Sequence, residues 1–226
     1  MRLTAREDDV TDAWSRAAFL REYVRAPFSV AAVTPSGRAL AGLVTAPVPH
    51  RGDPVIVELG AGTGAFTAAV QRRLAGRGHH LAIEINERFA GVLAARFPQV
   101  DVAVADAFRL REVLAGRGLD RADVIVSGLP WAAFTAARQD ELLSAVAGAL
   151  APAGAFTAFG YTLFRAAPGA RRLRRALGDH FEEVVTGRTV WANLPPAFVH
   201  ICRRPREPWL PSPGGGCRAG AVGAGR

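Results

Sequence analysis

The sequence predicts a doubly wound α/β fold built on a mostly parallel, seven-stranded sheet. From Pro54 onward, short apolar runs alternate with longer amphipathic stretches, as in repeated βα units with right-handed crossovers. The first five are mostly apolar runs of strand length, which is typical of parallel strands covered on both faces. We expect strands at residues 55–59, 81–85, 100–104, 123–127, 155–159, 181–190 and 198–203, and helices at residues 65–74, 87–97 and 139–150.

The two ends of the chain differ in composition from this βα region. Asp12 can cap a helix over residues 12–25, and a second short helix is expected over residues 36–44. The last segment is rich in Pro, Gly, Ala and Arg, a composition typical of disorder. We therefore predict three parts, which are an N-terminal helical extension or lid (1–46), the main domain (47–204) and a disordered tail (205–226).

Composition narrows the range of partners. Half of the 226 residues are hydrophobic, and the net charge is +8 with Arg in place of Lys throughout. This charge favours an anionic partner, either nucleic acid or an acidic membrane surface. Cys202 and Cys217 lack metal-ligand spacing, so neither a disulfide framework nor a metal site is expected. Without an apolar leader or a run of membrane-spanning length, we expect a cytoplasmic protein, soluble or peripheral to the inner face of the membrane.

The strongest local signal is the segment 55–67, VIVELGAGTGAFT. An apolar strand ends near Glu58, and Gly60, Gly62 and Gly64 then turn the chain into a helix. Glycines at such a turn permit positive φ and let a ligand approach bare backbone. By itself, the loop is also consistent with an ordinary tight connection between a strand and a helix.

Carboxylates near the ends of the next two strands favour ligand binding. Glu84 lies at the end of the second expected strand, where its carboxylate can accept both ribose hydroxyls of a nucleotide. Asp106 follows the third strand, where a short side chain and the adjacent backbone can contact an adenine edge. A dinucleotide is disfavoured, because Glu58 would repel a pyrophosphate but suits the cationic amino group of a methionine moiety.

The order E-L-G-x-G-x-G, Glu84, Asp106 resembles motifs I to III of class I S-adenosylmethionine-dependent methyltransferases, which have a Rossmann-like fold. The resemblance implies that S-adenosylmethionine is the cofactor, with its methionyl end at Glu58 and the glycine loop, its ribose at Glu84 and its adenine at Asp106 and Ala107. The implied cofactor-binding residues are Glu58, Gly60, Ala61, Gly62, Thr63, Gly64, Glu84, Ile85, Asp106, Ala107 and Ser127.

The segment 124–134, VIVSGLPWAAF, resembles the N-L/I-P-Y/F signature of adenine N6-methyltransferases, including the ribosomal RNA dimethylases. Gly128, however, stands where those enzymes have the asparagine that bonds the adenine amine. A closer resemblance is to bacterial phospholipid N-methyltransferases, which carry S-G-L-P at this position. The segments 19–44 and 190–204 (VWANLPPAFVHICRR) also resemble that family, so the likeness covers roughly residues 19–204.

This second resemblance implies methyl transfer to a phosphatidylethanolamine-type lipid at an anionic membrane surface. We expect the acceptor to meet a catalytic loop made of Ser127, Gly128, Leu129, Pro130 and Trp131. A methylated ammonium suits an aromatic lining through cation–π attraction, so Trp131 and Tyr161 are candidate substrate-binding residues, as is Trp191, with core packing as the alternative.

Basic side chains on two expected surface segments could attract anionic lipid. They are Arg21 and Arg25 of the N-terminal helix and the Arg-rich stretch 171–175. We predict that the N-terminal helix docks on anionic bilayers without spanning them. A solvated helix face explains the charges of residues 171–175 equally well.

Three other functions stay open. An RNA methyltransferase related to the adenine dimethylases is favoured by charge and disfavoured by Gly128, and a small-molecule N- or O-methyltransferase would share the cofactor motifs. A non-catalytic scaffold with this fold is disfavoured because Glu58, Glu84 and Asp106 are all present. Methyl transfer from a sulfonium needs alignment and exclusion of water rather than a metal, and no His lies in the loop 127–131 to take a proton.

Overall fold

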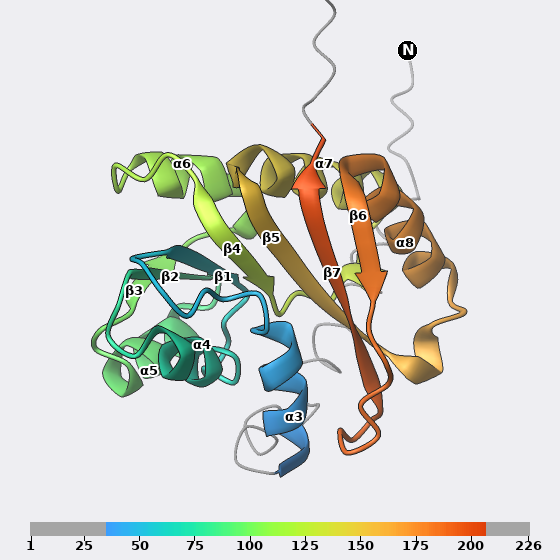
Figure 1. The fold of residues 1–226 in the computed structure, drawn as a ribbon, viewed down its shortest axis with the longest axis horizontal. Helices are drawn as coiled ribbons and strands as arrows, with labels where there is room; N and C mark the ends of the chain where they lie inside the picture. Colours follow the sequence, from blue (N-terminus) through green and yellow to red (C-terminus); the bar gives the residue numbers. More distant parts are fainter. Residues whose placement is uncertain (1–34, 207–226) are drawn as a thin grey trace, which may run out of the picture.

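The computed structural model describes residues 35–206, which form a seven-stranded sheet covered by helices (Figure 1). The strand order is β3-β2-β1-β4-β5-β7-β6. Strands β1 to β5 run parallel, and β7 is antiparallel to both β5 and β6. The strands are β1 (Val55–Leu59), β2 (His79–Glu84), β3 (Asp101–Val104), β4 (Ala122–Ser127), β5 (Leu150–Tyr161), β6 (Phe181–Thr186) and β7 (Ala197–Pro205). The predicted doubly wound, mostly parallel sheet is confirmed.

Helices pack on the two faces of the sheet, as alternating strands and helices require. The first face carries α3 (Pro35–Val44), α4 (Thr67–Leu74) and α5 (Glu87–Arg96). The second face carries α6 (Leu110–Ala115), α7 (Ala136–Ala149) and α8 (Pro168–His180). Three short 3-10 turns follow β3, β4 and β5, and these are η1 (Ala107–Arg109), η2 (Trp131–Ala133) and η3 (Thr162–Phe164).

Alternate residues of the central strands enter different cores. On β1, Val57 and Leu59 pack in the larger core with α6, α7 and α8, whereas Ile56 packs in the second core with α3 and α4. Leu40 and Val44 of α3 also belong to the second core. Because both faces of the central strands are used in packing, a ligand has access to them only at their ends.

Element bounds differ from the prediction in the second half of the chain. β6 ends at Thr186 rather than at residue 190, because the chain leaves the sheet at Gly187 and only Val190 of the connection pairs again, with Ala197. Helix α6 was not predicted, and of α8 only the Arg-rich stretch 171–175 was considered as a helix face, without bounds. In α8 the Arg-rich sequence obscures the helical spacing of Leu173 and Leu177, which are buried.

Parts of two predicted segments lie outside the described residues. They are the N-terminal helix over residues 12–25, with Arg21 and Arg25, and the tail from residue 207 onward. The predicted extension 1–46 is described from residue 35, where α3 begins, and Pro205 is the last residue of β7. Within residues 35–206, no helix combines the length and the apolar character needed to cross a membrane.

Candidate active site

The glycine-rich loop joins β1 to α4, and its backbone is left-handed at three positions. The φ angle is +68° at Gly60, +56° at Gly62 and +95° at Gly64, a region that favours glycine. Packing also restricts Gly60, because a Cβ there would lie 2.7 Å from the Cδ2 atom of Leu129. A Cβ on Gly62 would meet only open space. The loop therefore leaves bare backbone uncovered at Gly62.

Glu84 ends β2 beside this loop and is buried. Its Oε2 atom accepts a hydrogen bond of 2.8 Å from the backbone N–H of Gly62, and its Oε1 atom accepts one of 2.9 Å from Asn86. The carboxylate thus holds the loop in place. Each oxygen retains a second lone pair, so the group can still accept the two ribose hydroxyls predicted for it.

Glu58 lies on β1 and is fully buried. Its Oε2 atom accepts a hydrogen bond of 2.6 Å from the hydroxyl of Thr67, and His80 Nε2 lies 3.3 Å from the same oxygen. Its Oε1 atom has no hydrogen-bond partner among residues 35–206. Since an unpartnered buried carboxylate oxygen is costly, this atom is suited to receive a donor from a ligand.

Thr67 and His80 were not among the predicted site residues. Both have signals that could have identified them. Thr67 stands in the first turn of the helix that the glycine loop opens, and His80 precedes by two residues the β2 position that pairs with Glu58. Gln71 of α4 continues the network, because its Nε2 atom lies 2.9 Å from His80 Nδ1.

Asp106 follows β3 and caps η1, where its Oδ1 atom accepts a hydrogen bond of 3.1 Å from the Phe108 backbone N–H. Its Oδ2 atom lies 3.9 Å from the guanidinium of Arg138, which sits 4.0 Å above the Phe108 ring. Ile85, directly after Glu84, is 65% exposed. An exposed apolar side chain beside Glu84 is suited to pack against a flat ring such as adenine. Ala107, in contrast, is buried.

Ser127 and Trp131 brace the loop that follows β4. The Ser127 hydroxyl accepts hydrogen bonds of 2.8 Å from the Trp131 indole N–H and 3.3 Å from the Leu129 backbone N–H. Trp131 is 1% exposed and packs edge-on against Phe134 and Phe156 in the larger core. The ring supports the loop from inside the protein, and the structure does not bring it to the surface, where the predicted cation–π contact would form.

Gln139 of α7 was not predicted and connects this loop to a neighbouring helix. Its Nε2 atom donates hydrogen bonds of 2.7 Å to the Trp131 carbonyl and 3.2 Å to the Gly169 carbonyl. Gly169 lies in the first turn of α8 and packs so tightly on η2 that a Cβ there would overlap the Ala132 carbonyl. The loop after β4 is therefore fixed on the α8 side.

Gly128 packs against the glycine-rich loop through backbone alone. Its N–H donates a hydrogen bond of 2.8 Å to the Leu59 carbonyl. A Cβ on Gly128 would lie 2.6 Å from the carbonyl oxygen of Gly60, a distance that requires one of the two backbones to shift. The glycine-rich loop and the loop after β4 can therefore lie this close only because position 128 has no side chain.

The other candidate aromatic residues lie near the ends of β5 and β7. Tyr161 ends β5, is half-buried and contacts Phe159 edge-on, and burial raises the pKa of its hydroxyl, which therefore stays protonated. Trp191, in the connection between β6 and β7, is 76% exposed. No contact with a substrate is tested for either residue, so their roles stay predictions.

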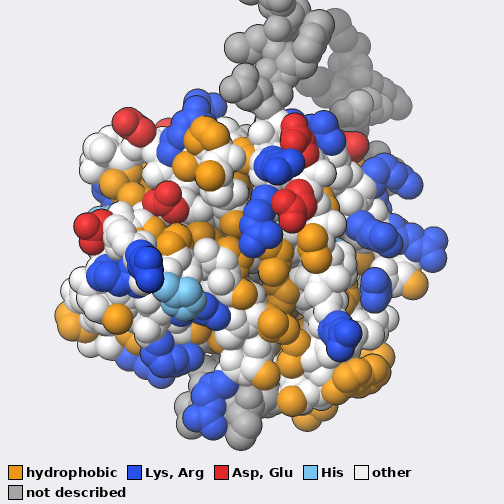
Figure 2. All heavy atoms as spheres, in the orientation of Figure 1, with side chains coloured by type: hydrophobic (Ala, Val, Ile, Leu, Met, Phe, Trp, Pro, Cys, Tyr) orange, Lys and Arg blue, Asp and Glu red, His pale blue; other side chains and the backbone are white. Residues whose placement is uncertain are grey.

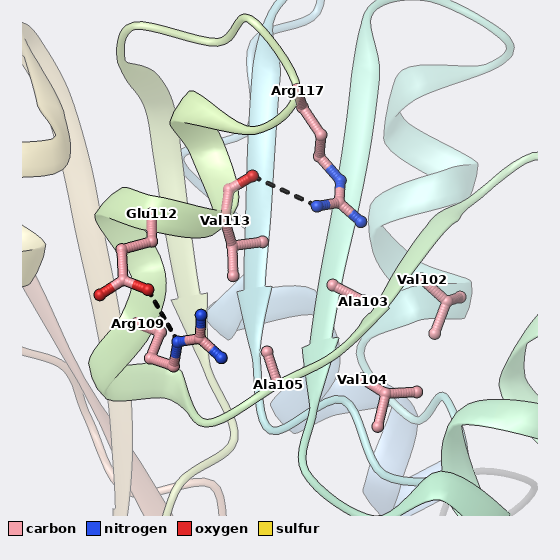
Figure 3. A pocket seen from close by; sticks show the side chains of 8 residues that line it. All are labelled: Val102, Ala103, Val104, Ala105, Arg109, Glu112, Val113 and Arg117. Atoms are coloured by element: carbon pink, nitrogen blue, oxygen red, sulfur yellow. Dashed lines mark hydrogen bonds and ion pairs between the residues drawn. The ribbon is translucent and has the colours of Figure 1, made fainter.

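A separate hollow of about 310 Å³ lies beside the edge strand β3, between that strand and α6 (Figure 3). Its polar side chains are paired, Arg109 with Glu112 at 2.8 Å and Arg117 with Asp101 at 2.6 Å. None of the predicted site residues lines it. Across residues 35–206 there is no group of three or more His, Cys, Asp or Glu side chains that could hold a metal ion.

Solved structures with the same fold include methyltransferases. Residues 56–154 match the family model described as a methyltransferase domain. Magnesium protoporphyrin IX methyltransferase from Synechocystis PCC 6803, solved with bound S-adenosylmethionine, has a TM-score of 0.58 and 11% identity, covering 91% of this chain and 100% of that one. An S-adenosylmethionine-dependent O-methyltransferase from Thermotoga maritima has a TM-score of 0.56 and 15% identity, covering 75% and 67%.

A curated relative gives the family. Ornithine lipid N-methyltransferase from Singulisphaera acidiphila is 32% identical over 192 residues, which cover 84% of this chain and 96% of that protein. The chain belongs to the class I S-adenosylmethionine-dependent methyltransferases and is an enzyme of that class. The predicted relation to ribosomal RNA adenine dimethylases has no support from these matches.

S-adenosylmethionine is the cofactor, and features of the carboxyl edge of the sheet fit it. The bare backbone at Gly62 offers a surface that a ligand can approach closely, and the exposed Ile85 offers an apolar one. Between them lies the Glu84 carboxylate, while the orphaned Glu58 oxygen suits a cationic amino group. The assignment of each residue to a part of the cofactor stays a prediction.

Proposed function

We propose that the protein N-methylates the amine of a membrane lipid of the phosphatidylethanolamine type. The lipid substrate in the name of the 32% identical relative supports an amine-bearing lipid as the acceptor. The S-G-L-P segment and the segment around Trp191, which resemble phospholipid N-methyltransferases, support the same class.

The observation that carries this proposal is the contact between Gly128 and Gly60. A planar nucleobase needs a side-chain carbonyl to hold its amine, and an asparagine at position 128 would place its Cβ 2.6 Å from the Gly60 oxygen. A flexible alkylamine has no such need, because the backbone carbonyls near Ser127 and Gly128 can orient it. The packed loop therefore favours a primary alkylamine over adenine.

Methyl transfer at this site depends on alignment. When bound, S-adenosylmethionine would supply a methyl group on a sulfonium, so that a neutral amine nitrogen could bond to the methyl carbon as the carbon–sulfur bond breaks and the neutral thioether leaves. The loop from Ser127 to Trp131 holds the acceptor and keeps water out, and its stiffness comes from the Ser127 bonds and the Gln139 bond to the Trp131 carbonyl. No histidine lies in the loop 127–131, and in this proposal the proton lost by the amine passes to water.

The test offers the full-length protein several acceptors with radiolabelled cofactor. Vesicles containing phosphatidylethanolamine, vesicles containing an ornithine lipid, total RNA and a small-molecule extract are incubated in parallel. We expect label in phosphatidylethanolamine. Label in the ornithine lipid alone would support lipid methylation but contradict the phosphatidylethanolamine-type head group. Label in RNA or in small molecules alone would overturn the proposal. Cofactor binding without any transfer would favour the scaffold function.

A membrane role for the N-terminal segment is part of the same proposal. Removing residues 1–26 should weaken binding to anionic vesicles, and added salt should reproduce the loss. Equal co-sedimentation with and without these residues would show that the segment has no part in docking.

A further inference from the structure

Four large apolar side chains are exposed near one another beyond the ends of β5 and β6. They come from η3 and from the connection between β6 and β7, and their exposed fractions are 74% for Leu163, 57% for Phe164, 76% for Trp191 and 85% for Leu194. We call these four residues the apolar rim. Figure 2 shows hydrophobic side chains gathered over this region, at the lower right of the molecule. Exposed apolar patches of this kind mark interaction sites.

Hydrogen bonds hold the two segments of the rim together. The Thr162 N–H in η3 donates a bond of 2.9 Å to the Pro196 carbonyl in the β6–β7 connection. The connection is itself closed by a 2.7 Å bond from the Val190 N–H to the Ala197 carbonyl and a 2.6 Å bond from Asn193 Nδ2 to the Pro195 carbonyl. Trp191 and Leu194 are therefore presented outward by an ordered loop.

The described chain segments that form and flank the rim carry basic residues and no acidic ones. Neither residues 142–178 nor residues 184–206 contain an Asp or a Glu. Arg165 directly follows Phe164, and Arg188 lies three residues before Trp191, and both are exposed. This combination of apolar and cationic groups complements a bilayer with anionic head groups, where Trp side chains and Arg are favoured at the interface.

The rim lies at the same edge of the sheet as the loop after β4. β5 and β6 run in the same direction as β4, so the segments that follow all three strands emerge at one edge. Ser127 at the end of β4 pairs with Ala158, three residues before the end of β5. A membrane that touched the rim would thus face the edge at which the acceptor is expected.

We propose that the apolar rim is the surface by which the protein enters an anionic lipid bilayer. Leu163, Phe164, Trp191 and Leu194 insert below the head groups, while Arg165 and Arg188 contact lipid phosphates. This inference rests on the proposed lipid methylation for its biological meaning. Its physical basis is the exposure, order and charge of the rim, which can be tested without any methyl transfer.

The direct test places an environment-sensitive fluorophore on the rim. Leu194→Cys is made in a Cys217→Ser background, and Cys202 stays unlabelled because it is buried and burial raises the pKa of its thiol to about 12. The matched control carries the label at Asp120→Cys, an exposed site before β4 at the opposite edge. Vesicles of phosphatidylglycerol and phosphatidylcholine are added to the full-length labelled proteins, and quenching by lipids brominated in the acyl chains is measured.

The two labels distinguish the possible occupants of the rim. We expect a blue shift and acyl-chain quenching for Leu194→Cys only, and only with the anionic vesicles. If the label's emission shifts to the blue without lipid and the shift grows with protein concentration, the occupant of the rim is a second copy of the chain. If that shift does not depend on protein concentration, the occupant is a terminal segment of the same chain. Either result, or equal responses at both labels, would overturn the proposal.

A second test separates docking from chemistry. Leu163→Ser combined with Leu194→Ser should reduce partitioning into anionic vesicles about tenfold or more, whereas Val92→Ser, which removes an exposed valine from α5, should leave it unchanged. Cofactor affinity, measured in the same samples, should stay constant. Partitioning that is the same in both variants would overturn the proposal even if lipid is methylated. Reduced partitioning would support it even if the methyl acceptor proves to be another molecule.

Discussion

The carboxyl edge of the sheet has two halves with different chemistry. Beside β1, β2 and β3, the strand ends carry acidic side chains, Glu58, Glu84 and Asp106, together with bare glycine backbone. Beyond β5 and β6, the described segments 162–167 and 187–196 carry exposed apolar side chains and Arg and contain no acidic residue. The loop after β4 lies between the two halves. One edge thus offers carboxylates to a cationic cofactor and a cationic, apolar surface to an anionic lipid layer.

The two halves also differ in how their shape is maintained. In the cofactor half a side chain holds the backbone, since Glu84 accepts hydrogen bonds from Gly62 and Asn86. In the other half the apolar side chains of the rim take no part in holding the backbone, which is fixed by the bond from Thr162 to Pro196 and by the buried Asn193 side chain. A substitution in the first half should therefore disturb structure and binding together, whereas one on the rim should disturb binding alone.

The largest expected effect concerns the loop between the halves. Trp131→Ala should lower the free energy of unfolding by about 3–5 kcal/mol, because it removes a buried ring and its bond to Ser127. Urea unfolding measures this loss. The control is Trp191→Ala on the rim, which should change stability by less than about 0.5 kcal/mol. Equal losses of unfolding free energy in the two variants would mean that Trp191 is packed against other residues and is not exposed on the rim.

Trp131→Phe is the variant that addresses chemistry, because it keeps most of the packing. Because the indole is buried, the three methylation steps should slow by the same factor, whereas a greater slowing of the second and third steps would show that the ring meets the growing positive charge. Mass spectrometry of mono-, di- and trimethylated products gives the three rates. Equal slowing of all three methylations would mean that Trp131 acts only by supporting the loop after β4.

Gly128→Asn should reduce kcat/KM for the lipid acceptor by about 100-fold, because the Gly60 carbonyl forces the two loops apart. Gly128→Ala introduces the same Cβ without the amide and should lose nearly as much activity. RNA should remain unmethylated by both variants. A gain of RNA methylation by the asparagine variant would refute the view that this loop is shaped for an alkylamine.

Glu84→Ala should weaken cofactor binding roughly tenfold to a hundredfold, through the loss of charge-assisted contacts and of the anchor at Gly62. Isothermal titration calorimetry measures the affinity. Glu183→Ala, which removes an acid from β6 in the other half, is the matched control and should bind normally. If Glu84→Ala binds the cofactor with unchanged affinity, the prediction that Glu84 binds the ribose hydroxyls is wrong.

The smallest expected effect is a pH dependence in the acceptor half. Burial, followed by the charges of Arg174 and Arg165, lowers the pKa of His200 from 6.5 to about 4. The unfolded chain therefore binds this proton more readily, and stability is lost as pH falls from about 6.5 towards 4, by about 2 kcal/mol at pH 5. Denaturant unfolding at pH 7 and pH 5 should show a smaller loss for His200→Gln. The exposed His50→Gln variant should behave as wild type.

The cofactor half was predictable because its signals are local. Strand length and apolar content locate the ends of β1 and β2, and Gly60, Gly62 and Glu84 follow from those ends. The close approach of Gly128 to Gly60 joins segments almost 70 positions apart, and no local pattern reports it. From the sequence, Trp131 could either pack in the core or line the substrate site. Its contact with Phe156 in the structure shows that it packs in the core.

The rim was missed for a related reason. Trp191 was considered as a lining for a methylated ammonium, but the rim as a surface joins two segments about 30 positions apart that the sheet topology brings to one edge. The predicted strand 181–190 also concealed the connection that carries Trp191, because Thr186 was read as the interior of a strand. The bounds of helix α8 were not predicted because its arginines obscure the apolar pattern, although Leu173 and Leu177 have the spacing of one helical face.

The contact between Gly128 and Gly60 also constrains how the acceptor preference of this enzyme can change over mutational steps. A single substitution at position 128 meets the Gly60 oxygen 2.6 Å away whichever larger residue is introduced. A route towards a side-chain amide there must first, or simultaneously, widen the glycine-rich loop, which also carries the Gly62 backbone held by Glu84. Active variants selected from a library randomised at position 128 alone should carry glycine there. When residues 59–64 are randomised as well, variants that accept new methyl acceptors should bind the cofactor more weakly.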